Sequence, residues 1–168
     1  MNLRRFLRPE AIRLELRTVP TPQENKDENS PAYLERIRDS VLWELVELFA
    51  QTGNIVNQSK LFVDLRNREK RASTAVGEGV ALPHVRTMQA RTFTMAFARS
   101  TPGLPFGAPD SQPVHIFFGL VAPPYDDRIY LKVYRELGPL LLNPDWRAEL
   151  MAAQDPHRVL RLLELVRR

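Results

Sequence analysis

The chain contains no cysteine among its 168 residues, and its apolar runs are short. The missing thiols exclude disulfides, thiolate metal sites and cysteine nucleophiles. The longest apolar run, Ile116 to Pro124, is far shorter than the roughly 18 residues that a membrane helix needs, so we expect no membrane insertion. The polar and charged opening residues, MNLRRFLRPE, are also unlike a signal peptide.

Histidine is scarce as well, with only three residues in the chain: His84, His115 and His157. Their spacing does not form the ligand triad of a zinc site. We therefore expect no metal, and we interpret His115 and His157 as structural or surface residues.

Lysine is rare too, because four of the 24 basic residues are lysine and twenty are arginine. The net charge of +4 is concentrated in residues 60–99, which hold eight basic side chains against three acidic ones. Guanidinium groups suit phosphate oxygens, although codon bias would produce the same composition. The interleaved aromatic residues of a nucleic-acid stacking surface are missing from this window, so we expect no nucleic-acid partner.

The length and the ordinary balance of 43% hydrophobic and 26% charged residues predict one soluble domain with an appendage. Residues 1–31 are interpreted as an N-terminal segment that includes a proline-bearing flexible loop over 19–31, and residues 32–168 as the domain. Near the start, Ile12, Leu14 and Leu16 alternate, which fits either a short strand or a helix.

The hydrophobic pattern of the domain predicts helices first, then strands, then helices again. Helices are expected over 31–53, about 58–67 and 127–142, with a kink or break at Gly138-Pro139, and two more begin near Pro144 and Pro156. A strand or hairpin-like loop is expected over 73–82, strands over 93–98 and 114–121, and a loop over 100–113. This order indicates a mixed α/β domain in which helices cover a sheet.

Residues 68–84 carry the groups that suggest chemistry. His84 follows a proline at the end of an expected strand, and a neutral imidazole is a good nucleophile near neutral pH. Upstream lie two adjacent hydroxyls, Ser73 and Thr74, and a cation, Arg68. A phosphoryl group needs such donors for positioning and charge neutralisation. The alternatives are a structural histidine, a solvated charge pair of Arg68 and Glu69 at a helix end, and hydroxyls that only shape a turn.

The run R-E-x-x-x-S-T-x-x-G-x-G-x-A-x-P-H over residues 68–84 resembles the signature of the fructose/mannitol-type IIA domain. This type 2 EIIA family belongs to the bacterial phosphoenolpyruvate-dependent phosphotransferase system. The nitrogen-regulatory, stand-alone IIA-like branch matches best. The resemblance extends over roughly 34–166 and includes the segment LPFGAPDSQPV at 104–114.

The resemblance implies a mixed β-sheet sandwiched between helices in three α/β/α layers, a cytoplasmic location, and no metal or organic cofactor. By the same resemblance, His84 accepts the phosphoryl group from an HPr-like phosphocarrier protein. Arg68 lies beside it, and Ser73 or Thr74 shapes the surrounding pocket. Because the chain carries no permease segment, we expect regulation of a protein target rather than sugar import.

One position departs from the family pattern. Many members carry a second histidine where this chain has Tyr130. A tyrosine hydroxyl donates a hydrogen bond but lacks the imidazole's positive charge. This leaves two hypotheses open, a phosphocarrier that works without the second histidine, and a regulatory protein-binding module on the same fold with weak or lost phosphotransfer.

Overall fold

A computed structural model describes residues 2–21 and 30–164. Its centre is a six-stranded sheet of order β1-β5-β6-β3-β2, with β4 also paired to β6. The strands are β1 (Leu7–Arg13), β2 (Ala75–Gly77), β3 (Val80–Ala81), β4 (His84–Arg86), β5 (Thr94–Leu104) and β6 (Val114–Ala122). The helices are α1 (Pro31–Ala50), α2 (Gln58–Arg71), α3 (Asp127–Leu141), α4 (Pro144–Ala152), α5 (Pro156–Glu164) and the 3-10 turn η1 (Leu3–Phe6).

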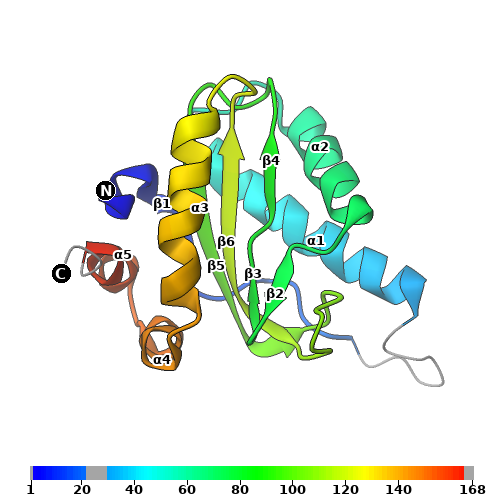
Figure 1. The fold of residues 1–168 in the computed structure, drawn as a ribbon. Coiled ribbons are helices and arrows are strands. Elements are labelled where there is room, and N and C mark those ends of the chain that lie inside the picture. The colour runs from blue at the N-terminus through cyan, green and yellow to red at the C-terminus, as the bar shows by residue number, and fades with distance from the viewer. Residues whose placement is uncertain (1, 22–29, 165–168) are drawn as a thin grey trace.

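The sheet is mixed, because β6 pairs antiparallel with β5 but parallel with β3 and β4. Helix α1 crosses behind the sheet and α3 lies in front of it (Figure 1). The predicted α/β class, with a mixed sheet between helical layers, is confirmed.

Strand β6 is buried on both faces, as its apolar run predicts. On one face Gly119 lets α1 approach closely, since a Cβ at this position would lie 2.7 Å from Cζ of Phe49. On the other face the rings of Phe118 and Trp146 stack 6.1 Å apart, which packs α4 onto the sheet. The core therefore lies on both sides of β6 and holds its carboxyl end, and β4 beside it, in place.

The N-terminal segment takes part in this core. The open question at its start is resolved as a strand, because β1 pairs parallel with β5. Glu44 of α1 anchors the residues that follow by accepting hydrogen bonds from the backbone N–H groups of Arg17 (2.9 Å) and Thr18 (2.8 Å). Of the loop expected over 19–31, residues 22–29 lie outside the described ranges. Thr21 donates its N–H to the Tyr33 hydroxyl at 3.1 Å.

The cap predicted at the start of α1 is confirmed, since the Ser30 hydroxyl accepts the Tyr33 N–H at 3.2 Å. Helix α2 begins at Gln58 as expected but continues beyond the predicted end near residue 67, to Arg71. Its last turn is charged, and hydrophobic periodicity therefore does not reveal it. Glu69 in that turn is nevertheless buried.

One further expectation is wrong, and another is wrong in part. Strand β5 runs through Leu104 where a loop was expected from residue 100. Its register with β6 shifts between Arg99 and Leu104, so Pro102 costs no regular ladder bond. Helix α3 is not broken at Gly138-Pro139 but continues to Leu141. Pro139 lies in the last turn, where one missing N–H is offset by the burial of Leu141.

Candidate functional site

His84 opens β4, which lies between α2 and α3 (Figure 1). The strand is held by parallel pairing with β6, in which His84 is opposite Leu120 and the Leu120 N–H donates to the Pro83 carbonyl at 2.9 Å. The preceding Leu82 and Pro83 are buried, whereas the imidazole is half-buried. A rigid base therefore presents the ring to a partly open surface.

The two ring nitrogens of His84 have different neighbours. Nδ1 lies 2.6 Å from the Leu82 carbonyl oxygen, and Nε2 lies 3.4 Å from Nη2 of Arg68. A carbonyl only accepts and a guanidinium only donates, so the neutral ring carries its proton on Nδ1. Nε2 is then unprotonated and carries the lone pair that a nucleophile needs.

Arg68 comes from the last turn of α2, and it has an anchor of its own. Its Nη1 donates to the Ala72 carbonyl at 3.0 Å while Nη2 faces His84. The structure therefore brings together His84 and Arg68, which the sequence analysis placed in one site.

Tyr130 also lies beside His84, with the two ring centroids 5.6 Å apart. Burial is the main cause that raises the pKa of Tyr130, to about 12, so its hydroxyl stays neutral and able to donate. Tyr134, one turn later on α3, is 5.8 Å from the His84 ring. Sequence reasoning missed Tyr134, although its i,i+4 spacing from Tyr130 was a usable signal.

A cavity of about 510 Å³ opens in front of this histidine. It is lined by Arg68, Arg71, His84, Val85, Arg86, Pro124 and Tyr130. Within the described ranges this lining holds three arginines and no carboxylate. Arg86 pairs with Asp127 at the start of α3, outside the cavity lining. Arg71 and Arg86 were not singled out from the sequence, although the basic surplus of residues 60–99 pointed to this region.

Burial lowers the pKa of His84 below its ordinary value, and the Arg68 cation lowers it further. The hydrogen bond to the Leu82 carbonyl opposes the shift but does not cancel it. At neutral pH the imidazole is therefore predominantly neutral, which is the protonation state that a nucleophile needs.

Ser73 and Thr74 are close in sequence to the site, but their hydroxyls are used elsewhere. Ser73 Oγ donates to the Phe106 carbonyl at 2.9 Å, and Thr74 Oγ1 donates to Glu69 at 2.7 Å. Neither residue is among the cavity's lining residues in the described part of the chain. Their contacts shape the turn after α2 rather than the cavity wall.

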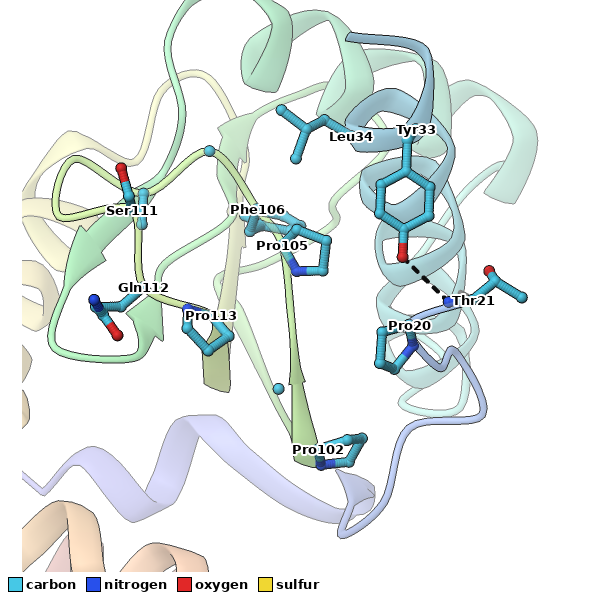
Figure 2. Close-up of a pocket in the computed structure, with 13 residues that line it drawn as sticks. Pro20, Thr21, Tyr33, Leu34, Pro102, Pro105, Phe106, Ser111, Gln112 and Pro113 are labelled. Carbon is cyan, nitrogen blue, oxygen red and sulfur yellow. Dashed lines mark hydrogen bonds between the residues drawn. The ribbon is translucent and has the colours of Figure 1, made fainter. Parts of the chain in front are cut away.

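A second hollow, of about 480 Å³, lies between the start of α1 and residues 102–113 (Figure 2). Prolines and Phe106 form its walls, and the Tyr33 hydroxyl at its edge bonds to the Thr21 N–H (Figure 2). Among the described residues that line it, none carries a charge. It therefore lacks the cations that a phosphoryl group requires.

The other two histidines lie away from His84. His115 is the second residue of β6, with its Nδ1 3.0 Å from the Ser100 carbonyl, and His157 lies in the first turn of α5. Within residues 2–21 and 30–164, no three His, Cys, Asp or Glu side chains gather where they could hold a metal ion. Over the same ranges, no helix combines the length and apolar character needed to cross a membrane.

A mixed sheet between helices, with a histidine among arginines at the start of a short strand, defines a IIA-type phosphotransferase-system domain. The chain belongs to the family described as "Phosphoenolpyruvate-dependent sugar phosphotransferase system, EIIA 2", whose model matches residues 35–165. The resemblance stated from the 68–84 motif is thereby confirmed.

Among curated proteins, a nitrogen regulatory protein of Bradyrhizobium diazoefficiens is 33% identical over 123 residues, covering 72% of this chain and 80% of that protein. The fructose-specific EIIABC component of Bacillus subtilis is 27% identical over 126 residues, which cover 75% of this chain and 20% of that protein. The chain thus spans only a fifth of the length of that protein.

Solved structures agree. IIA-Ntr of Neisseria meningitidis is 25% identical with a TM-score of 0.78, covering 96% of this chain and 98% of that one. IIA mannitol of Escherichia coli has a TM-score of 0.69, covering 92% of this chain and 96% of that one; at 19% identity this likeness shows the fold alone. The nitrogen-regulatory branch is supported, and a IIA-like phosphocarrier or regulatory role follows from the family.

Proposed function

We propose that this protein accepts a phosphoryl group on Nε2 of His84 from an HPr-like phosphocarrier in the cytoplasm, and that it regulates a protein target according to its phosphorylation state. One observation carries the proposal. The bond from Nδ1 to the Leu82 carbonyl leaves the lone pair of Nε2 directed toward Arg68 at the arginine-lined cavity. Membership of the EIIA 2 family supplies the class of donor.

The proposed step needs no cofactor and no net proton transfer. The lone pair of Nε2 attacks phosphorus and forms an N–P bond, while the bond between phosphorus and the ring nitrogen of the donor's histidine breaks. The electron pair of that bond returns to the donor imidazole. Catalysis then consists of positioning the phosphoryl group and neutralising the charge of its oxygens during transfer.

The cavity at His84 supplies both the positioning groups and the positive charge. Arg68 lies next to the attacking nitrogen, and Arg71 and Arg86 provide further positive charge in the lining. No carboxylate of the described residues pairs with Arg68 or Arg71, so these two cations are available to an anion. The neutral Tyr130 hydroxyl is a further donor beside the ring.

The second candidate function is a protein-binding module on the same fold that no longer transfers phosphate. The observation that favours it is Tyr130 at the position of the second histidine, 5.6 Å from His84, where it cannot supply an ionic partner to the phosphoryl group. This module would dock its target in the unphosphorylated form only.

One assay separates the two functions. The chain is incubated with phosphoenolpyruvate, Enzyme I and HPr-type carriers and examined by intact mass under alkaline conditions, where phosphohistidine is stable. We expect one phosphate on the wild type and none on His84→Ala. His157→Ala, which changes an exposed histidine on α5, is the matched control and should keep the phosphate. If the wild type gains no phosphate from any cognate carrier, the phosphocarrier function is wrong and the binding module remains.

A further inference from the structure

The residue after Arg68 is a carboxylate that the site chemistry does not use. Glu69 is only 3% exposed, yet it lies in the charged last turn of α2. Its two oxygens accept both the N–H and the hydroxyl of Thr74, each at 2.7 Å. We call this pair of hydrogen bonds the Glu69–Thr74 clasp. It closes the turn of residues 69–74, which connects α2 to β2.

The clasp encloses the group that anchors Arg68. Ala72 lies between the two clasp residues, and its carbonyl accepts Nη1 of Arg68 at 3.0 Å. Because the ends of the turn are fixed by the clasp, the direction of the Ala72 carbonyl is fixed as well. An arginine side chain has many rotamers, so an anchored guanidinium is what keeps Nη2 directed at His84.

Thr74 also connects to the other neighbour of the histidine. Its backbone carbonyl accepts the Leu82 N–H at 3.0 Å, and the Leu82 carbonyl in turn lies 2.6 Å from Nδ1 of His84. Thr74 is thus connected to both groups. It is connected to Arg68 through the clasp, and to the His84 imidazole through the backbone of Leu82.

We propose that Glu69 and Thr74 are positioning residues whose clasp fixes the placement of Arg68 relative to Nε2 of His84. The effect of the clasp on the phosphorylation rate rests on the proposed phosphoryl acceptance at His84. Its effect on the placement of Arg68 does not. The clasp also accounts for the hydroxyl of Thr74 in the 68–84 motif, which acts on the cavity through Arg68 and not by lining it.

The test uses the full chain and two readouts. The first is the pKa of His84, measured by NMR on the unphosphorylated protein. Titratable or charged groups around this ring are Arg68 and Arg71 from α2, Arg86 from β4, and Tyr130 and Tyr134 from α3. The second readout is the rate of phosphorylation by the carrier. The variants are Thr74→Val, Arg68→Gln and the double variant.

Arg68→Gln removes a nearby cation and should raise the pKa of His84. Thr74→Val removes half of the clasp and should also raise the pKa of His84. Its phosphorylation rate should be between about 10-fold and 100-fold lower than that of the wild type. In the Arg68→Gln background, Thr74→Val should change neither readout much further. Such non-additivity is expected only if Thr74 acts through Arg68.

Two controls separate positioning from stability. Thr74→Ser retains the hydroxyl and should behave like the wild type. Thr52→Val makes the same change at another buried threonine, whose hydroxyl bonds to the Phe49 carbonyl at the end of α1, and should leave the pKa of His84 unchanged. If Thr74→Val does not fold, Thr74→Ala is compared with Thr74→Ser instead.

Additive effects in the double variant, or an unchanged pKa of His84 in Thr74→Val, would overturn the positioning role. Absence of phosphorylation in the wild type would overturn the proposed function instead. In that case the titration would still decide whether the clasp positions Arg68.

Discussion

Nε2 of His84 lies 3.4 Å from Nη2 of Arg68, while Nδ1 of the same ring lies 2.6 Å from the Leu82 carbonyl oxygen. The two neighbours favour the same tautomer, because one only donates and the other only accepts. Protonation of Nε2 would convert the contact with Arg68 into a repulsion between two cations. Arg68 therefore favours the neutral form of His84, which is the nucleophilic form.

The first prediction concerns the pH dependence of phosphorylation. Burial, and next to it the Arg68 charge, lowers the pKa of His84 below 6.5, so the neutral ring persists into mildly acidic solution. The rate at saturating phosphorylated carrier should be level near neutral pH and fall only below about pH 6.5, as Nε2 gains a proton. Rates measured between about pH 5 and 8 check this. A midpoint above that of a free histidine would contradict it.

The second prediction concerns Tyr130. Because its pKa is raised to about 12, the hydroxyl supplies a neutral donor and no positive charge. Tyr130→His should raise the rate of phosphoryl transfer without changing the stoichiometry of one phosphate per chain, since an imidazolium stabilises the phosphoryl oxygens more strongly. Tyr130→Phe is the matched control and should not raise the rate. An equal rate in wild type and Tyr130→His would show that the second histidine is irrelevant in this chain.

The third prediction concerns the arginines at the cavity. Arg71 lines the cavity without a carboxylate partner among the described residues, so its charge adds to the field at His84. Arg71→Glu should slow phosphorylation by about tenfold at low ionic strength, and added salt should reduce the difference. Arg161→Glu makes the same charge change on the exposed face of α5 and should have little effect. Equal effects of the two substitutions would mean that only net charge matters.

Local signals in the sequence were enough for much of the fold. The Ser30-Pro31 cap placed the start of α1, and the apolar run from Val114 marked β6 as a strand buried on both faces. The strand nature of residues 7–13 could not be decided, because β1 is defined by its pairing with β5, far away in the chain. Pairings of that kind leave no local pattern.

The site was likewise predictable only where local sequence signals exist. The motif over 68–84 identified His84 and Arg68, and the structure places them in contact. The convergence of Arg86 and Tyr134 on the cavity region depends on how β4 and α3 pack, which spacing alone does not give. The direction of the Thr74 hydroxyl depends on the buried Glu69, a partner that the sequence analysis interpreted only as part of a charged pair.

The fourth prediction concerns the segment between β1 and α1. Thr21 and Ser30 on either side of residues 22–29 make their own contacts with the Tyr33 hydroxyl and the Tyr33 N–H. A deletion within 23–28 that leaves these anchors should change the free energy of unfolding by less than about 1 kcal/mol, because loop-closure entropy varies slowly with length. Urea unfolding measures this. A larger loss of stability would show that the deleted residues contribute packing.

The last prediction contrasts two buried glutamates. Burial alone would raise the pKa of Glu44, but hydrogen bonds from Thr18, Arg17 and Arg13 lower it overall. A lowered folded-state pKa contributes stability that is present above the ordinary value of 4.5 and is lost as pH falls through the folded pKa. Glu44→Gln should therefore cost about 1–3 kcal/mol at neutral pH and much less in acid.

Glu69 should show the opposite sign, because burial raises its pKa and the bonds from Thr74 and the charges of Arg38 and Arg68 only partly offset this. Its contribution to stability is complete below the ordinary value of 4.5 and is lost as pH rises through the raised folded pKa. A glutamine amide can still accept the Thr74 N–H and donate to its hydroxyl, so Glu69→Gln should be at least as stable as the wild type at neutral pH. That advantage should vanish in acid. Urea unfolding of both variants over a pH series tests the pair, and parallel pH dependences would contradict the assignment of opposite shifts to the two carboxyls.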